Sequence, residues 1–228
     1  MKREDGRKPH ELRPVEIKAG VLPRATGSAL VKMGKTHALV AVYGPRSLHP
    51  RHLQLSDKAL LQTNYTMMPF STTERVRPGY SRRSIEISKV IKDALGPVVY
   101  AEEFPKATID VYIDIIQADA GTRTAAINAA SVALADAGVP MRDLVTAVAV
   151  GKIEDQFVVD LTGKEEEVTK CDMPIAYVPR GKKITLLQLD GDVSHEDFKE
   201  LLKLATKACE TIYEKQRQAL IEKWSKRL

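Results

Sequence analysis

The sequence predicts an α+β fold in which helices pack on a mixed β-sheet, with its clearest elements in β-β-α-β-α-β order. Short apolar segments that alternate with polar residues recur along the chain, and this pattern is typical of half-buried strands. Two longer segments, 82–95 and 122–136, have the spacing or the apolar content of buried helices. Strands and helices do not alternate regularly, which argues against a doubly wound sheet.

The composition is that of a globular protein with a substantial core. Of the 228 residues, 43% are hydrophobic and 29% are charged, so the chain is long enough to bury a core of ordinary size. It has no Gly/Ser-rich linker and no repeat, and we expect residues 1–228 to form a single domain. No apolar run approaches the roughly 18 residues of a membrane span, and the charged start predicts no signal peptide.

Charge and cysteine content indicate the partners and the compartment. The formal net charge is +5 and the pI is about 9.1, which mildly favours a polyanionic partner. Cys171 and Cys209 form neither a CxxC pair nor a zinc-binding pattern. We therefore expect a cytoplasmic protein in which these thiols stay reduced.

The N-terminal third is predicted to consist mainly of strands. Residues 1–12 are expected to form a polar arm. Period-two alternation and turn residues predict strands near 14–22, 28–33, 37–43 and 62–70.

The middle of the chain contains two predicted helices with the clearest strand between them. From Arg82 to Leu95, aliphatic side chains recur with helical spacing, and Gly96-Pro97 ends the helix. Residues 107–117 alternate between aliphatic and polar side chains, as in a strand with one buried face. Residues 122–136 are apolar nearly all round, so this helix should be deeply buried.

The C-terminal third is predicted to add further strands and one long helix. Apolar runs predict strands near 145–152, 158–160, 173–178 and 184–189. Ser194 and Asp197 form a variant of the capping box, with Asp in place of Glu. They begin a final helix that we expect to run to the C-terminus.

The first candidate site is the segment Ala120-Gly121-Thr122-Arg123, which opens the second helix. The free N–H groups and the positive dipole end of a helix N-terminus attract anions. Arg123 adds a guanidinium that fits phosphate through two parallel hydrogen bonds. The sequence therefore predicts a phosphate site at Gly121, Thr122 and Arg123, and the alternative is a capped helix with a surface arginine.

The second candidate site is basic and lies at the start of the first helix. Four arginines fall within nine residues there: Arg75, Arg77, Arg82 and Arg83. Such a cluster can bind successive phosphates of a single nucleic-acid strand. The use of arginine rather than lysine throughout favours phosphate recognition. The alternative is a solvated, charged surface.

The third candidate site is acidic and precedes a predicted strand. Glu166 and Asp172 are six residues apart, so they could meet across a turn. Asp172 adjoins apolar residues, and burial would raise its pKa into the range of a general acid. We expect Glu165 and Glu167 to lie in a surface loop. For Asp172 the alternative role is a cap at the start of the strand.

Other polar residues are weaker candidates. His49 and His52 lack a third ligand at metal-binding spacing, so no metal site is predicted. Asp110 and Asp114 share a strand face, and solvation of that face explains them better than a two-metal nuclease does. The sequence has no GxSxG, Walker A, HExxH or GxGxxG motif.

Several blocks of the sequence also occur together, in one order, in a known family. They are Asp5-Gly6-Arg7, Leu12-Arg13-Pro14, Gly27-Ser28-Ala29, Pro69-Phe70-Ser71, Asp172-Met173-Pro174 and the segments 42–45, 49–53, 74–89, 117–123 and 133–140. With these blocks the chain resembles the RNase PH family of phosphorolytic 3′→5′ exoribonucleases over nearly its whole length. The resemblance is greatest to the catalytic RNase PH-type subunits of archaeal RNA exosomes.

The resemblance implies an RNase PH-like fold and a ring of six subunits. Three copies of the chain would alternate with three copies of a related inactive subunit, and single-stranded RNA would thread the central channel by its 3′ end. Arg51 would line the channel neck, Arg82 and Arg83 would hold the RNA 3′ end, and residues 121–123 would hold phosphate. The sequence shows no S1-type or KH-type extension, so we expect RNA-binding cap proteins as further partners.

The chemistry that the resemblance implies is phosphorolysis, with inorganic phosphate as co-substrate. Phosphate attacks the last phosphodiester and a nucleoside diphosphate leaves. Arg123, the other arginines and backbone N–H groups would neutralise the charge as phosphate approaches phosphate. Asp172 would protonate the leaving 3′-oxygen. The resemblance makes Mg²⁺ a candidate metal, although no motif requires it.

The acidic segment departs from the family pattern, which usually has two aspartates. Glu166 stands at the first position and is followed by Val168-Thr169-Lys170, whereas Asp172 matches the second. A misplacement of about 1 Å can lower a rate roughly 100-fold. One alternative is therefore a non-catalytic, RNA-binding ring subunit. Another is a homohexameric, bacterial-type RNase PH that trims tRNA 3′ ends.

Overall fold

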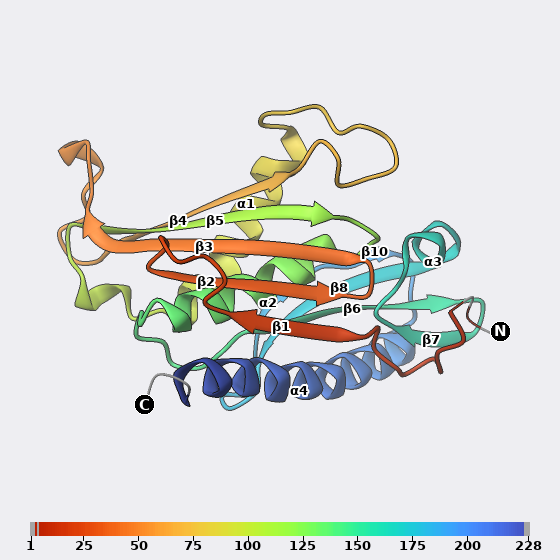
Figure 1. Cartoon of the computed structure of the whole chain (residues 1–228). Helices are drawn as coiled ribbons and strands as arrows, with labels where there is room; N and C mark the ends of the chain where they lie inside the picture. Colours follow the sequence, from red (N-terminus) through yellow and green to blue (C-terminus); the bar gives the residue numbers. More distant parts are fainter. Residues whose placement is uncertain (1–2, 4, 226–228) are drawn as a thin grey trace.

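The computed structural model describes residue 3 and residues 5–225, and it has two β-sheets with a helix packed between them (Figure 1). The first sheet has the order β1-β2-β3-β5-β4. Strands β4 and β5 pair in parallel, and the other pairs are antiparallel. The strands are β1 (Val15–Ala19), β2 (Gly27–Met33), β3 (Thr36–Ser47), β4 (Leu60–Met67) and β5 (Ala107–Gln117).

The second sheet is antiparallel and has the order β10-β8-β6-β7, with β9 also paired to β8. Its strands are β6 (Thr146–Ile153), β7 (Gln156–Val159), β8 (Cys171–Val178), β9 (Lys183–Leu187) and β10 (Asp190–Gly191). In this register Asp172, near the start of β8, lies opposite Gly151 on one side and Asp190 on the other.

The helices lie on both sheets and between them. They are α1 (Arg82–Leu95), α2 (Thr122–Asp136), α3 (Gly163–Val168) and α4 (His195–Ser225), with single 3₁₀ turns at Arg51–Leu53, Gly96–Val98 and Ala101–Glu103. Helix α1 packs on β4, and α4 runs along β1 and β6, below both sheets in Figure 1. No helix in the part of the chain that the structure describes is long and apolar enough to cross a membrane.

Helix α2 is the centre of the core. All of its residues except Arg123 and Ala135 are buried, and it packs on β2 and β3 of the first sheet and on β6 of the second. Small residues allow this close approach: a Cβ at Gly27 would lie 2.2 Å from the backbone nitrogen of Ala137. The Asn128 amide joins α2 to β6, because its Nδ2 donates to Ala147 O at 2.7 Å and its Oδ1 accepts from Ala147 N at 2.8 Å.

Most of the predicted elements are confirmed. The helices over 82–95 and 122–136 and the strand over 107–117 have the predicted bounds. The cap of the last helix is also confirmed, because Ser194 Oγ accepts from Asp197 N at 3.1 Å. Helix α4 is described as far as Ser225, and residues 226–228, where it was expected to end, lie outside the described residues.

Predictions based on local polarity were wrong at several charged residues. Glu165 is buried in α3 rather than lying in a surface loop, because it forms an ion pair with buried Arg3. Arg3 also departs from the predicted polar arm, whose residues 1–2 and 4 lie outside the described residues. Asp110 is buried rather than solvated, because Arg46 and Thr108 donate hydrogen bonds to it.

Some strand ends also differ from the prediction. Strand β4 ends at Met67, before Pro69, and β3 continues to Ser47, four residues beyond the expected end. The two-residue strand β10 has no periodic signal, so sequence patterns do not detect it.

We expect Asn128→Ala to lower the free energy of unfolding by about 2–4 kcal/mol, since each buried backbone group left without a partner costs roughly 1–3 kcal/mol. The variant removes the partners of both the N–H and the C=O of Ala147. Urea unfolding of the two proteins measures the difference. Gln218→Ala, at an exposed position of α4, is the control and should change stability by less than about 0.5 kcal/mol. Equal effects of the two substitutions would contradict the role of Asn128.

Candidate active site

The loop between β5 and α2 presents an open helix N-terminus. Ala120 and Gly121 have φ of 59° and 62°, in the left-handed region where glycine is favoured. Gly121 is the N-cap of α2 and brings no side chain to the N–H groups of the first turn. Thr36 Oγ1 holds the loop in place by donating to Ala120 O at 2.6 Å. The predicted residues Gly121 and Thr122 therefore stand where a helix attracts an anion.

Arg123 extends this N-terminus with a guanidinium that is only partly paired. Its Nη1 donates to Gln188 Oε1 at 2.5 Å, and its Nη2 lies 3.7 Å from Glu86 Oε1. Its Nε is buried and has no hydrogen-bond partner in the described part of the protein. The side chain is 23% exposed, so it can reach a ligand while its position stays fixed by Gln188.

Asp172 lies close enough to Arg123 for the two charges to interact. Burial is the main cause that raises the pKa of Asp172 to about 6; the charge of Glu166 adds to this, Arg123 opposes it and Asp190 makes a smaller contribution. The Oδ1 atom is buried and has no hydrogen-bond partner among the described residues. The predicted rise in the pKa of Asp172 is thus confirmed, and the carboxyl is part protonated near neutral pH.

Glu166 approaches Asp172 from α3, as the spacing predicted. Its own side chain is exposed, and its charge is the second largest cause of the raised pKa of Asp172. The segment between them is the end of α3 followed by two residues, 169–170, outside helix and strand, so it is not the surface loop expected there. Asp172 therefore lies within reach of two charges, that of Glu166 and that of Arg123, and the two carboxyls form one acidic group.

The arginine cluster lies at the same end of the first sheet as residues 118–121, the loop between β5 and α2, which we call the phosphate loop after the predicted site. The segment that carries Arg75 and Arg77 is tied to the end of β5 by a hydrogen bond from Ala118 N to Ser71 O at 2.8 Å. It continues into α1, whose first residues are Arg82 and Arg83 (Figure 1). All four arginines are exposed.

Buried Tyr65 connects the arginine cluster with the phosphate loop. Burial raises the pKa of its hydroxyl, and Thr122, Arg83 and Arg123 act in the opposite direction. Arg83 of α1 and Arg123 of α2 therefore both lie near one side chain of β4. The structure brings these two predicted sites together.

Arg51 is not part of this assembly. It lies in the turn that follows β3, whereas Gly121 follows β5, and these two strands are antiparallel neighbours. The two residues consequently lie toward opposite ends of the first sheet. Arg51 is exposed, so it is available to a ligand that extends well away from the phosphate loop.

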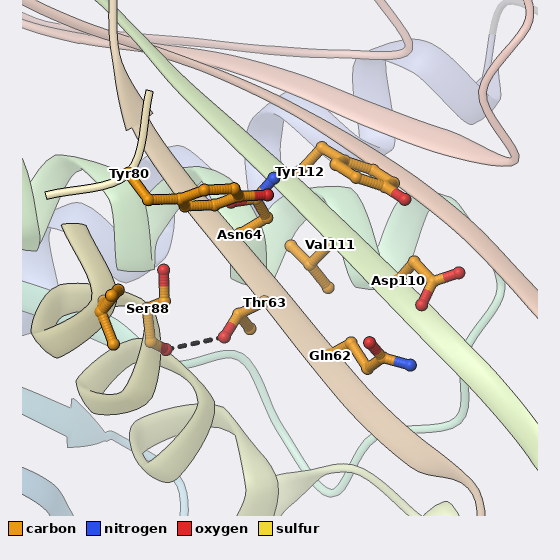
Figure 2. Close-up of a pocket in the computed structure, with 9 residues that line it drawn as sticks. Gln62, Thr63, Asn64, Tyr80, Ser88, Asp110, Val111 and Tyr112 are labelled. Carbon is orange, nitrogen blue, oxygen red and sulfur yellow. Dashed lines mark hydrogen bonds between the residues drawn. The ribbon is translucent and has the colours of Figure 1, made fainter. Parts of the chain in front are cut away.

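A separate pocket of about 350 Å³ lies beside β4, β5 and α1 (Figure 2). Tyr80 and Tyr112 lie over it, and Thr63 Oγ1 donates to Ser88 O at 2.6 Å on its helical side. None of its nine lining residues belongs to the predicted phosphate or RNA sites. The pocket thus shares α1 with the arginine cluster, but the candidate catalytic residues Arg123, Glu166 and Asp172 do not line it.

Sequence reasoning missed four residues of the site: Tyr65, Glu86, Gln188 and Asp190. Tyr65 lies in the predicted strand 62–70 and Gln188 in the predicted strand 184–189, and Asp190 directly follows the latter. The only local signal is the polar break Gln188-Leu189-Asp190-Gly191 after an apolar run. In the described residues no group of three or more His, Cys, Asp or Glu is arranged to hold a metal ion.

Comparison with family models shows to which family the chain belongs. Residues 11–140 match the model described as "3′ exoribonuclease family, domain 1", and residues 143–208 match "3′ exoribonuclease family, domain 2". The chain belongs to the 3′ exoribonuclease (RNase PH) family. The predicted family membership and the α+β, RNase PH-like fold class are thereby confirmed.

The curated relatives are components of archaeal exosomes. The chain is 55% identical to exosome complex component Rrp41 of Pyrococcus abyssi, over 99% of the chain and 90% of that protein. It is 54% identical to Rrp41 of Methanopyrus kandleri, over 97% and 93% of the two chains. Among solved structures, rice Rrp46 superposes with a TM-score of 0.86 at 27% identity and covers 96% of this chain and 99% of its own.

The raised pKa of Asp172 makes the stability of the fold depend on pH. The ordinary value is 3.8 and the folded value is about 6, so the folded protein holds this proton more tightly than the unfolded chain. The stability that the protonated carboxyl contributes is complete below the unfolded pKa and is lost as the pH rises through the folded one.

We therefore expect Asp172→Asn, which cannot ionise, to unfold at a higher temperature than wild type at about pH 8 and at nearly the same temperature at about pH 4. Thermal unfolding at a series of pH values measures this. Asp57→Asn, at an exposed position, should follow the wild-type curve. A difference between Asp172→Asn and wild type that stays constant across the series would refute the shift.

Proposed function

We propose that the chain is the phosphorolytic 3′→5′ exoribonuclease subunit of an archaeal-type exosome core. It uses inorganic phosphate as co-substrate and releases nucleoside diphosphates from RNA 3′ ends. The observation that carries the proposal is the meeting of an open helix N-terminus and Arg123 with a partly buried acid, Asp172, whose Oδ1 is inaccessible and whose pKa is about 6. Identity of 49–55% to archaeal Rrp41 proteins over nearly the whole chain supports it.

Inorganic phosphate binds at the first turn of α2 in this proposal. The N–H groups after Gly121 and the hydroxyl of Thr122 surround the anion, and Arg123 adds a charge that is held in place by Gln188. Phosphorolysis brings two phosphate groups together, so their repulsion is the barrier that the site must lower. Donors that are already oriented in a half-buried site stabilise this charge without reorganising during the reaction.

Asp172 is the general acid of the proposed reaction. An oxygen of inorganic phosphate forms a bond to the last phosphorus of the RNA, and the bond from that phosphorus to the 3′-oxygen breaks. The proton of Asp172 passes to this 3′-oxygen. The charge of Glu166 helps to keep the proton on Asp172 until it is needed, because it raises the pKa of that carboxyl.

Arginines bind the RNA at its 3′ end and also farther along the strand in this proposal. Arg82 and Arg83 bind the phosphates of the last nucleotides, and Arg75 and Arg77 bind those just outside the site. Arg51, toward the other end of the first sheet, contacts the strand farther from its 3′ end, as a residue of the channel neck would.

The acidic group also fits a magnesium ion. Mg²⁺ usually takes one or two carboxylates and completes its coordination with water and substrate phosphates. Glu166, whose carboxylate is exposed beside Asp172, is the residue that would hold it. A bound Mg²⁺ would neutralise charge between the attacking phosphate and the RNA.

The proposed assembly is a ring of three copies of this chain and three copies of a related inactive subunit, with RNA-binding cap proteins above it. The ring is located in the cytoplasm. Within it the whole chain acts as a single domain, although its two halves match separate family models. Support for this comes from one continuous core cluster that includes residues of both sheets.

We expect Arg123→Ala to abolish phosphate-dependent shortening of RNA, with a loss of more than about 100-fold, because both phosphate binding and charge stabilisation are removed. The assay is release of nucleoside diphosphate by the ring assembled with the related subunit. Arg217→Ala, at an exposed position of α4, is the matched control. Unchanged phosphorolysis by Arg123→Ala would sink the assignment.

The double variant Arg82→Glu, Arg83→Glu should weaken RNA binding and reduce its dependence on salt concentration, because phosphate contacts release counterions. Each lost contact should lower the slope of log K against log[salt] by about 1. Titrations of single-stranded RNA at several salt concentrations measure both quantities. Equal affinity and slope in the two proteins would remove these arginines from the RNA site.

A non-catalytic role in the ring is the second candidate, and the replacement of the first family aspartate by Glu166 is what favours it. The chain would then bind RNA in the ring without degrading it. An assembled ring that binds RNA but releases no diphosphate in phosphate buffer would support this role. Turnover by the ring would exclude it.

A further inference from the structure

The N-terminal segment is fixed to the acidic segment by a buried ion pair. Arg3 donates from Nε and Nη2 to the two carboxylate oxygens of Glu165, each at 2.7 Å. It also donates to the backbone oxygens of Val159 at 2.9 Å and Asp160 at 3.0 Å. Both side chains are nearly inaccessible to solvent. In Figure 1 this segment, in red, runs beside β7, close to α3.

A second buried pair links the end of β7 to the phosphate loop. Asp160 accepts from the backbone nitrogen of Arg13 at 2.9 Å and from its Nη2 at 2.6 Å. The same guanidinium donates from Nη1 to the backbone oxygen of Asp119 at 2.5 Å. Asp119 immediately precedes Ala120 and Gly121, so Arg13 connects the segment between β7 and α3 with the loop that opens α2.

Asp119 also connects the phosphate loop directly with α3. Its backbone nitrogen donates to Thr36 Oγ1 at 3.0 Å, which fixes it to the first sheet. Its Oδ1 accepts from the backbone nitrogen of Gly163, the first residue of α3, at 3.1 Å. A Cβ at Gly163 would lie 2.9 Å from that same oxygen, so the two segments are in close contact here.

Helix α3 needs such contacts to keep its place. It has six residues, and a helix this short is not stable alone in water. Its position, and with it the position of Glu166, is therefore set by what holds its ends. The hydrogen bond from Gly163 to Asp119 joins its first residue to the loop that carries Gly121 and Arg123.

We infer that Asp119 is a positioning residue for the proposed phosphorolysis, on which this inference rests. Its side chain holds α3 against the phosphate loop, so that Glu166 stays beside Asp172. The buried pairs of Arg3 with Glu165 and of Arg13 with Asp160 support the same arrangement from the N-terminal segment.

The substitution that tests this must spare the buried ion pairs. Removing one partner of a buried pair strongly destabilises a fold, so variants of Arg3 or Arg13 would mix misfolding with mispositioning. Asp119 is only half-buried, and Asp119→Ala removes the acceptor for Gly163 while both pairs remain. Asp119→Asn keeps an amide oxygen that can still accept the bond. Asp93→Ala, at an exposed position of α1, is the control.

In the assembled ring, Asp119→Ala should lower kcat for diphosphate release about 10- to 100-fold, as expected for a displacement near 1 Å, and leave the Kd for RNA unchanged. Asp119→Asn should restore kcat to within about threefold of wild type, and the control should match wild type. A purely structural role would change the Kd for RNA together with kcat.

Hydrogen exchange in the uncomplexed chain provides a readout that does not depend on activity. Amides of α3 should exchange faster in Asp119→Ala and return to the wild-type rate in Asp119→Asn. Unchanged exchange and unchanged kcat in Asp119→Ala would overturn the inference, and so would an equal loss in Asp119→Asn. If the wild-type ring itself releases no diphosphate, the proposed function fails, and the exchange result alone decides whether Asp119 positions α3.

Discussion

The burial of α2 between two sheets is the constraint on which the rest of the structure depends. Alanines and Gly27 let backbones meet at van der Waals distance, and the Asn128 amide fixes the helix against β6. A helix packed in this way can neither slide nor rotate without opening the core. Its N-terminus is therefore held where the first sheet ends and β8 of the second sheet begins. The anion site and the acid are neighbours because the core leaves them no other arrangement.

The charges around Asp172 then determine how readily its carboxyl holds a proton. A buried carboxyl with only an arginine beside it would be ionised, and with only another carboxyl it would hold its proton far too tightly. Asp172 has both neighbours, Glu166 and Arg123, and its pKa of about 6 lies between the two extremes. The arginine that we propose for phosphate binding thus also limits the proton affinity of Asp172. Phosphate at Arg123 would weaken that opposition and favour the protonated form, which is the form that the proposed general-acid step requires.

The sequence predicted the elements well wherever one residue period dominated. The bounds of α1, α2 and β5 follow from aliphatic spacing and from stop signals such as Gly96-Pro97. It also indicated Arg123 and Asp172, because a helix start and an acid beside apolar residues are local features. Glu165, Arg3 and Gln188 could not be placed, since their partners are far away in sequence and charged residues are normally solvated. What local patterns cannot show is which charges find a partner in the folded chain.

Glu166 stands where the family usually has an aspartate. The two side chains differ in length, whereas the direction in which residue 166 points is set by α3. Neighbouring residues of a helix point about 100° apart, and Glu165 is held inward by Arg3. The direction of Glu166 is consequently set by its neighbour and not by its own contacts. Its side chain is one methylene longer than that of aspartate and is exposed, so it can bend to place its carboxylate where a shorter side chain would stand. The longer side chain loses more rotamer freedom when it does so. This loss of rotamer entropy concerns only the Glu166 side chain, because Asp172 and Arg123 remain fixed by the core.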